Sequence, residues 1–295
     1  MMRILCIGEC MVEMAPEADG RYRMGFAGDT FNTAWYLRRL APAEVSVSFM
    51  SAVGDDAISG RLETFIRSTG IEPVLSVRPG MTVGLYMIAL SDGERSFSYW
   101  RSTSAARTLL DGATALPGLG SGDMAYFSGI TVAILSPGAR DGLAAILSEA
   151  RDRGVTVAFD PNLRPALWSS TREMCAETTR FAALADMVLP SFDDERQFFD
   201  DADVAATADR YATTDDKVVV VKNGAGPIVV RAGAQSTVIT PPKAPRIVDT
   251  TAAGDSFNAG LLAALSEGAS LDEATGRGCA VASRVIAERG ALVEI

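Results

Sequence analysis

Near its C-terminal end the sequence reads Asp249-Thr250-Thr251-Ala252-Ala253-Gly254-Asp255-Ser256-Phe257-Asn258-Ala259-Gly260. The three residues before it, Arg246-Ile247-Val248, predict a strand, and the apolar run at 261–265 predicts a helix. Small residues at the start of a helix leave backbone N–H groups free to bind an anion, and the helix dipole adds to this attraction. The stretch therefore predicts an anion-binding turn between a strand and a helix.

Asp255 lies at the mouth of this turn, next to the expected anion. Because a carboxylate repels a phosphate, an acidic residue at this position needs another task. Accepting the proton of an attacking hydroxyl is such a task. The alternative interpretation is an Asp that caps the N-terminus of a core helix.

The composition narrows the class of protein. A chain of 295 residues suits one large α/β domain with a small appendage. Its 27 basic and 37 acidic residues give a net charge of −10, and an acidic chain without a basic block is a poor nucleic-acid binder. We therefore expect no nucleic-acid partner.

Hydropathy and cysteine usage predict the compartment. No stretch is long and apolar enough to span a bilayer, and the apolar run at 4–7 is too short for a signal peptide. The four cysteines (Cys6, Cys10, Cys175 and Cys279) show no metal-ligand spacing, so we expect reduced thiols. These features predict a cytoplasmic protein with no membrane partner.

The sequence contains no histidine. This excludes a Ser-His-Asp hydrolase, a His-ligated zinc site and a His general base. Proton abstraction near neutral pH must therefore fall to a carboxylate, Lys, Tyr or Cys.

Apolar runs alternate with helical patterns along the chain. Strands are predicted at 4–7, 45–50, 124–128, 155–160, 187–189, 218–222 and 228–231, and helices at 30–40, 58–68, 140–151 and 272–289. Near-continuous apolar strands separated by helices indicate a mostly parallel sheet covered on both faces, which is a three-layer α/β/α fold. Ligands of such sheets bind beyond the carboxyl ends of the strands. The loops there are Gly129-Ile130, 160–164, Pro190-Ser191, 222–226 and the opening stretch.

One segment, 82–101, breaks the alternation. Its halves, 82–90 and 95–101, are strand-like, and Asp92-Gly93 between them is a strong signal for a two-residue hairpin turn. With this turn, Ser91 faces Glu94, Ala89 faces Ser96, Ile88 faces Phe97, Tyr86 faces Tyr99 and Gly84 faces Arg101.

Residues that face each other share a side of the hairpin. One side then carries Tyr86, Ile88, Phe97, Tyr99 and Arg101, and the reverse carries Leu85, Met87 and Trp100. We interpret the hairpin as a lid whose Tyr/Arg side covers a substrate, with the other side against a second subunit. A sheet simply packed on the core is the alternative, but it leaves Arg101 unexplained.

The loop before the first predicted helix reads Phe26-Ala27-Gly28-Asp29-Thr30-Phe31-Asn32. Gly28 allows a ligand to approach the backbone closely. Asn32, one turn into the helix, is placed to reach hydroxyl groups. Asp29 or Thr30 is expected to cap the helix.

Together, these stretches resemble the ribokinase-like (PfkB-type) carbohydrate kinases. The resemblance covers nearly the whole chain, from Gly8-Glu9 to Arg289-Gly290, and includes the family's C-terminal signature and its N-terminal Gly-Gly/Ala-x-x-x-Asn motif. It narrows to members that phosphorylate 2-keto-3-deoxygluconate through Gly28-Asp29-Thr30, Gly84-Leu85-Tyr86, Tyr99-Trp100-Arg101, Ser128-Gly129-Ile130, Asn162-Leu163-Arg164-Pro165 with Leu167-Trp168, and the opening stretch.

The resemblance implies a ribokinase-like fold and transfer of the ATP γ-phosphate to the 6-hydroxyl of 2-keto-3-deoxygluconate. It implies one kinase domain over residues 1–295, with a lid from about 10–27 and 82–101. The apolar reverse side of the hairpin predicts association of identical chains through the lid sheet. Asp255 would be the base, and Ala252, Ala253 and Gly254 would form the anion hole. The sugar acid would contact Gly28, Asp29, Asn32, Tyr86, Tyr99, Arg101, Ile130, Arg164 and Asp255, and ATP would contact Asn162, Ser191, Lys222, Gly224, Gly226, Ala252 and Gly254.

The residues themselves favour an anionic substrate. Arg101 on the aromatic side of the hairpin and Arg164 at a strand's carboxyl end suit a carboxylate, because Arg binds carboxylates through two parallel hydrogen bonds. For each arginine alone, a surface ion pair is the alternative.

The sequence departs from the family where Mg²⁺ is concerned. Many members carry an Asn-x-x-Glu motif that helps to place Mg²⁺ through water, whereas this chain reads Ser191-Phe192-Asp193-Asp194-Glu195. Either Asp194 or Glu195 takes the acidic position, and Mg²⁺ is expected to bridge phosphate oxygens. Two other functions remain open: a kinase for a neutral sugar such as fructose or ribose, and a sugar- or nucleotide-binding regulator without catalysis.

Overall fold

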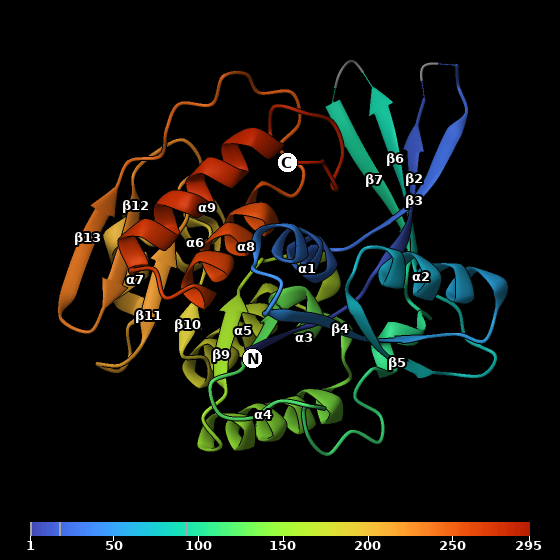
Figure 1. The fold of residues 1–295 in the computed structure, drawn as a ribbon, viewed down its shortest axis with the longest axis horizontal. Coiled ribbons are helices and arrows are strands. Elements are labelled where there is room, and N and C mark those ends of the chain that lie inside the picture. Colours follow the sequence, from blue (N-terminus) through green and yellow to red (C-terminus); the bar gives the residue numbers. More distant parts are fainter. Residues whose placement is uncertain (1, 18, 92–93) are drawn as a thin grey trace.

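The computed structural model describes residues 2–17, 19–91 and 94–295. Its main sheet has nine strands (Figure 1). In spatial order they are β13 (Gln235–Ile239), β12 (Ile228–Ala232), β11 (Val218–Val221), β10 (Met187–Val188), β9 (Thr156–Asp160), β8 (Met124–Ser128), β1 (Arg3–Ile7), β4 (Ser46–Val53) and β5 (Glu72–Val77). The strands from β5 to β11 are parallel, and β12 and β13 are antiparallel to their neighbours.

Alternate residues of the central strands enter different hydrophobic cores. On β1, Ile4 and Cys6 belong to one core and Leu5 and Ile7 to the other, and all four are fully buried. A strand buried on both faces has no polar side, which explains its continuous apolar sequence. The prediction of a three-layer α/β/α fold is confirmed.

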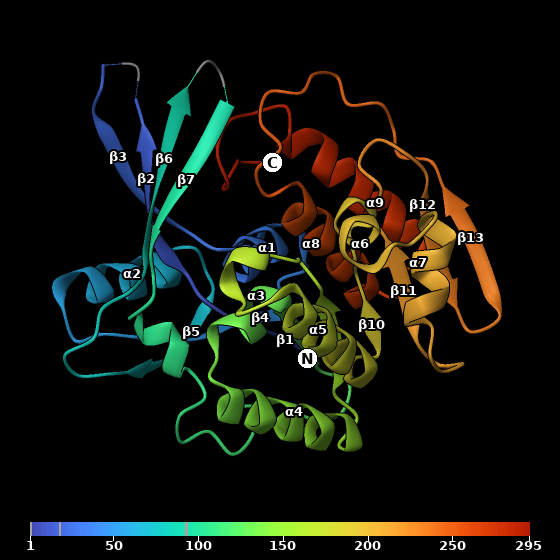
Figure 2. The same ribbon diagram turned by 180° about the vertical axis from the view of Figure 1, so that it is seen from behind.

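Helices cover the two faces of this sheet (Figures 1 and 2). One face carries α1 (Asp29–Leu40), α2 (Ala57–Ser68), α8 (Ala253–Ser266) and α9 (Leu271–Val285). The other carries α3 (Gly129–Ile134), α4 (Pro137–Asp152), α5 (Thr171–Leu184) and α7 (Val204–Tyr211). The short helix α6 (Phe192–Phe199) follows β10, and two 3₁₀ turns lie at Ala105–Thr108 and Pro165–Leu167.

A second sheet of four strands projects from the body beside the C-terminal segment (Figure 1). Its order is β3 (Tyr22–Ala27), β2 (Met11–Pro16), β6 (Leu85–Ser91) and β7 (Glu94–Trp100). In the β6–β7 pair Tyr86 lies opposite Tyr99 and Ile88 opposite Phe97, so the predicted register is confirmed. The predicted turn residues Asp92 and Gly93 lie outside the described residues.

Three local expectations were wrong. Arg246, Ile247 and Val248 form no strand but an exposed loop, in which the side chain of Ile247 is 70% exposed. The helix expected to reach residue 289 ends at Val285, and a tight turn follows it. Ile286 is partly buried and Ala287 is buried, so the apolar pattern continues past Val285 and periodicity alone did not reveal the end.

The start of α1 is the third difference. Neither Asp29 nor Thr30 caps this helix: the capping position is Gly28, whose residue type offers no side chain for a capping hydrogen bond. The Asp29 carboxylate instead accepts hydrogen bonds from Ser128 Oγ and Asn162 Nδ2. Long-range partners therefore took precedence over the local cap.

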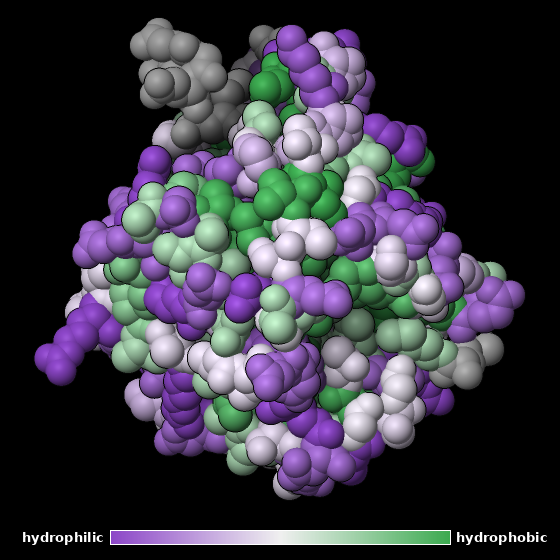
Figure 3. Space-filling view, turned by 90° about the vertical axis from the view of Figure 1, so that its left-hand side faces the viewer, coloured by the Kyte–Doolittle hydropathy of each residue, from purple (hydrophilic) through white to green (hydrophobic). Residues whose placement is uncertain are grey.

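The edge strand β13 exposes its first four residues, Gln235 to Val238. Figure 3, which views the molecule from this side, shows hydrophilic and hydrophobic residues mixed over the face. Within the described ranges, no helix combines the length and apolar character needed to cross a membrane.

Candidate active site

A cleft of about 1370 Å³ lies between the second sheet, the carboxyl ends of the parallel strands and the N-terminus of α8. It brings together residues from distant parts of the sequence. Of the residues predicted to bind or react, those lining it are Gly28, Asp29, Asn32, Tyr86, Tyr99, Arg101, Ile130, Asn162, Arg164, Ser191, Lys222, Gly224, Ala252, Ala253, Gly254 and Asp255. Gly226 and Glu195 are not among the lining residues.

The turn before α8 presents open backbone amides to the cleft. Ala252 adopts the left-handed conformation, with φ of 58°, which is uncommon for a residue with a Cβ. The amide of Ala253 donates to Thr250 O at 3.2 Å, and Ser256 donates to Ala252 O at 2.9 Å. Gly254 and Asp255 lie in sequence between Ala253 and Ser256, in the first turn of the helix. An anion in the cleft can accept hydrogen bonds from their backbone amides.

Asp255 is the third residue of α8 and reaches into the cleft. Its Oδ2 accepts a hydrogen bond from Asn32 Nδ2 at 2.8 Å. Burial, together with the negative charge of Asp29, raises the pKa of Asp255 to about 8. A carboxylate with a pKa near neutrality is suited to accept a proton from a hydroxyl group.

Asp29 and Asn32 are held in place from two sides. Gly28 packs so closely on the connection between β1 and β2 that an added Cβ would come within 2.1 Å of Glu9 O. This contact seats the start of α1 against the sheet. Asn32 accepts from Gly28 N at 3.3 Å and donates to Asp255, so it links α1 to α8.

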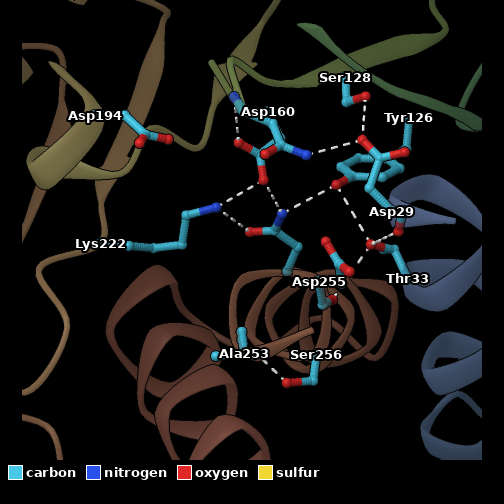
Figure 4. A network of polar contacts seen from close by, with 12 residues as sticks. Asp29, Thr33, Tyr126, Ser128, Asp160, Asp194, Lys222, Ala253, Asp255 and Ser256 are labelled. Carbon is cyan, nitrogen blue, oxygen red and sulfur yellow. Dashed lines mark hydrogen bonds and ion pairs between the residues drawn. The ribbon is translucent and has the colours of Figure 1, made fainter. Parts of the chain in front are cut away.

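A buried polar network connects the two halves of the cleft (Figure 4). Lys222, just after β11, donates to Asp160 Oδ2 at 2.7 Å and to Asn258 Oδ1 at 3.1 Å. Asn258 Nδ2 in turn donates to Asp160 Oδ2 at 2.6 Å and to the hydroxyl of Tyr126 at 3.0 Å. These four residues are each less than one-tenth exposed.

Arg101 lies at the base of the second sheet, where its guanidinium forms an ion pair with Glu9. Both side chains are buried, and Glu9 also accepts a hydrogen bond from Ser104 Oγ. Within the described part of the chain, Nε of Arg101 has no hydrogen-bond acceptor. The hydroxyl of Tyr86, nearby on β6, donates a hydrogen bond to Glu13.

The two candidates for the acidic metal position lie in different surroundings. Glu195 is fully buried away from the cleft, where it accepts hydrogen bonds from Arg210 and Tyr211, and burial raises its pKa to about 7. Asp194 lines the cleft and forms an ion pair with Arg164 at 3.6 Å. Of the two, Asp194 faces the cleft where a ligand would lie.

Several cleft residues had no role in the sequence-based prediction. They are Glu9 and Asp160, the loop from Pro241 to Ile247, the α9 residues Cys279, Ala282 and Ser283, and Ile286 just after α9. Asn258, which bonds to Lys222 and Asp160 without lining the cleft, had none either. The sequence could have revealed Asp160 and Asn258, because each is a polar residue within an otherwise apolar strand or helix. Nothing in the sequence marks the α9 residues, since it is the packing of α9 on α8 that brings them to the cleft.

The arrangement is suited to phosphoryl transfer. A carboxyl group that can accept a proton lies beside open amides at a helix N-terminus, and a buried ammonium and a buried guanidinium line the same cleft. The chemistry of such a transfer depends on positioning and on stabilising the charge of the transferred group.

The comparison with known families defines the class of this protein. The chain belongs to the pfkB family of carbohydrate kinases, whose model matches residues 1–294. The fold agrees: fructokinase from Vibrio cholerae, solved with fructose, ADP and a calcium ion, superposes with a TM-score of 0.86 at 25% identity and covers 99% of this chain and 95% of that one.

Sequence relatives narrow the comparison within the family. The 2-dehydro-3-deoxygluconokinase of Escherichia coli K12 is 37% identical over 300 residues, which cover 99% of this chain and 97% of the relative. The 2-dehydro-3-deoxygluconokinase of Haemophilus influenzae is 34% identical over 302 residues, which cover 100% and 96%.

Proposed function

We propose that this protein transfers the γ-phosphoryl group of ATP to the 6-hydroxyl of 2-keto-3-deoxy-D-gluconate, giving 2-keto-3-deoxy-6-phosphogluconate. The observation that carries this proposal is the buried Arg101 in the same cleft as Asp255: it is paired with Glu9, and its Nε–H has no acceptor among the described residues. A neutral sugar needs no such cation, whereas the carboxylate of a sugar acid does. The full-length identity of 34–37% to 2-dehydro-3-deoxygluconokinases supports the same substrate.

In this reaction Asp255 accepts the proton of the substrate hydroxyl, with Asn32 orienting its carboxyl group. The amides of Gly254 and Asp255 bind the transferred phosphoryl group. Arg101 and Arg164 bind the substrate carboxylate, while Tyr86 and Tyr99 cover the sugar from the second sheet. Gly28, Asp29 and Ile130 shape the rest of the substrate site.

The nucleotide would occupy the other end of the cleft. Asn162, Ser191, Lys222 and Gly224 would contact its phosphates. The adenine would lie between the 241–247 loop and the C-terminal half of α9, where Cys279, Ala282 and the following Ile286 give an apolar wall. Gly226 shapes the same loop through its hydrogen bond to Asn223 O at 2.7 Å, without facing the ligand.

The residues present fit a Mg²⁺ ion held mostly by phosphate oxygens. The described residues contain no group of three acidic, Cys or His side chains that could hold a metal, while Asp194 offers one carboxylate to the cleft. Mg²⁺ usually keeps several waters and binds through one or two carboxylates plus phosphates. Asp194 would hold the ion through water, and the ion would neutralise charge on the phosphates.

Turnover of a substrate panel tests the proposal. Coupled ADP detection with 2-keto-3-deoxygluconate, its galactonate epimer, gluconate, fructose and ribose should give the highest kcat/KM for the keto acid. Loss of the carboxylate removes a charged hydrogen bond, so fructose and ribose should react at least tenfold less well. A 6-deoxy analogue of the keto acid should bind without being phosphorylated. Higher kcat/KM for fructose or ribose would overturn the assignment.

A neutral-sugar kinase is the second candidate, because the V. cholerae fructokinase shares the fold. The same panel distinguishes the two. ATP consumption that depends on an added sugar would exclude a regulator without catalysis.

We also propose that the second sheet acts as a lid and joins two copies of the chain. Its cleft side carries Tyr86 and Tyr99, and Trp100 on the reverse side is 57% exposed. An exposed Trp next to partly buried Leu85 is typical of an interface. Trp100→Glu should lower the mass measured by analytical ultracentrifugation, and an unchanged mass would contradict this interface.

A further inference from the structure

Lys222 occupies an unusual position for a lysine in this protein. Only three of the 27 basic residues in the sequence are lysines, at positions 217, 222 and 243. The Lys222 side chain is 11% exposed and lines the cleft, with its ammonium paired to Asp160. A buried ion pair by itself adds little to stability, because both charges lose their hydration. The pair therefore invites a functional explanation.

The ammonium of Lys222 lies next to the anion-binding turn. Its Nζ would be 3.6 Å from a Cβ added to Gly254, the residue whose amide is open at the start of α8. An ammonium has three N–H donors, and two are directed at Asp160 and Asn258. The third can therefore meet an oxygen of a ligand bound at Gly254.

Asn258 fixes this position from the helix that carries Asp255. It lies three residues after Asp255 on α8 and is fully buried. Its Oδ1 accepts from Lys222, while its Nδ2 donates to Asp160 and Tyr126. Because both ends of the amide are used, neither Leu nor Asp can replace it without losing a hydrogen bond.

We propose that Lys222 is a further catalytic residue that contacts the transferred phosphoryl group, and that Asn258 and Asp160 are positioning residues that aim it. This inference rests on the proposed phosphoryl transfer. In that step the substrate hydroxyl oxygen forms a bond to the γ-phosphorus as its proton passes to Asp255. The bond from the γ-phosphorus to the β,γ-bridging oxygen breaks, and its electron pair leaves with ADP. Lys222 offsets the negative charge on the equatorial oxygens of the group in transfer.

Nucleotide binding tests this contact without requiring any sugar substrate. Dissociation constants for ADP and for a non-hydrolysable ATP analogue are measured by calorimetry, both with Mg²⁺. Lys222→Met should weaken binding of the analogue about ten- to hundredfold, the range for loss of a charged hydrogen bond, and that of ADP less than about threefold. Lys222→Met leaves the buried Asp160 carboxylate without its cation, so the double variant Lys222→Met/Asp160→Asn is measured as well. It should also bind the ATP analogue more weakly while its affinity for ADP changes little.

Lys217→Met is the matched control. Lys217 is also buried, but its Nζ donates to Ala182 O and Ala183 O at the end of α5, away from the cleft. Its loss should lower stability and leave the ratio of the two dissociation constants unchanged. An equal change of ADP and analogue binding in Lys222→Met and in the double variant would overturn the proposal.

Kinetics then test the positioning role of Asn258. Lys222→Met should lower kcat on the order of 10²–10³-fold, as for removal of one donor to a charged transition state. If Asn258 acts through Lys222, Asn258→Leu/Lys222→Met should lose no more kcat than Lys222→Met alone. Multiplicative losses would show a separate structural role and overturn the positioning claim. If 2-keto-3-deoxygluconate is not turned over but the nucleotide result holds, the substrate assignment fails and the role of Lys222 stands.

Discussion

At the scale of single residues, Asp255 shows how burial raises the pKa of the proposed base. Its ordinary pKa of 3.8 would make it a weak proton acceptor, but desolvation and the nearby Asp29 carboxylate raise the pKa to about 8. Asn32 opposes part of this shift by donating a hydrogen bond to the carboxylate.

Asp255→Asn should retain the fold and nucleotide binding but lose phosphoryl transfer, because an amide cannot accept the proton. Removal of a general base costs on the order of 10²–10⁴-fold in rate. Steady-state kcat with the keto acid is the measurement, and binding of the ATP analogue is the control. A variant that keeps more than about a tenth of wild-type kcat would contradict this role, since such a loss is under ~1.4 kcal/mol.

The pH dependence of the reaction should report the same group. Since the base must be ionised in the free enzyme, kcat/KM should fall about tenfold per pH unit below pH 8 and level off above it. Replacing Asp29 by Asn removes its negative charge, which is the second cause of the raised pKa of Asp255. The fall in kcat/KM should then begin at a lower pH. A profile that is flat from pH 6 to pH 8 would exclude Asp255 as the titrating base.

Whereas kcat/KM should rise with pH, the contribution of Asp255 to the free energy of unfolding should fall. Because the pKa of Asp255 is raised from 3.8 to about 8, the folded protein holds this proton more tightly than the unfolded chain. The free energy of unfolding therefore contains a contribution that is present below pH 3.8 and is lost as pH rises to 8. Asp255→Asn lacks this titration, so its stability relative to wild type should grow between pH 5 and pH 9 in urea denaturation. A constant difference would argue against the raised pKa.

At the scale of elements, the β6–β7 pair divides its residues between two environments. Tyr86 opposite Tyr99 places the aromatic rings on the cleft side, with their centroids 5.9 Å apart, and Leu85 opposite Trp100 lies on the reverse side. A slip of one residue would exchange the two sets, because side chains alternate along a strand.

Arg101→Ala should raise the KM for the keto acid about tenfold to a hundredfold, the range for loss of a charged hydrogen bond. The KM for ATP should change little, because the proposed adenine site lies at the other end of the cleft from Arg101. Trp100→Ala is the neighbouring control: it should weaken association of the chains and leave the preference for a carboxylate intact. The reverse outcome for the two variants would show that the assignment of the faces is wrong.

At the scale of the whole molecule, the C-terminal segment joins the body to the second sheet. Ala291 packs with Met11, Tyr86 and Ile88, while Tyr36 on α1 donates to Ala291 O at 2.9 Å and accepts from Val293 N at 3.1 Å. Gly290 N donates to Asp249 Oδ2 at 2.7 Å, so the segment also contacts the loop before the anion-binding turn.

Tyr36→Phe should leave this segment's buried carbonyl and amide without their side-chain partner. Each lost partner of a buried polar group costs about 1–3 kcal/mol, so the variant should unfold at lower denaturant concentration. Urea titration followed by fluorescence measures the loss. Tyr22→Phe, at an exposed tyrosine on β3, is the control and should unfold like wild type. Equal stability of Tyr36→Phe and wild type would show that the segment is not held by this hydroxyl.

The sequence determined the elements and much of the site because their signals are local. Continuous apolar runs flanked by helical patterns predicted the buried strands, and Asp92-Gly93 with its flanking alternation predicted the register of β6 and β7. The run of small residues before Asp255 marked the start of α8. In each case the deciding interactions lie within a few residues, as in turns, pleats and helix termini.

Only the tertiary structure decided what these residues contact. It showed that Asp29 bonds to Asn162 instead of capping α1, that Asp194 faces the cleft while Glu195 is buried against Arg210, and that Arg101 is paired with Glu9. It also brought Asn258 and Lys222 to Asp160, across 98 and 62 residues of sequence. A side chain's partner and pKa depend on groups that the fold brings close from distant positions, and these distances are not encoded in any local pattern.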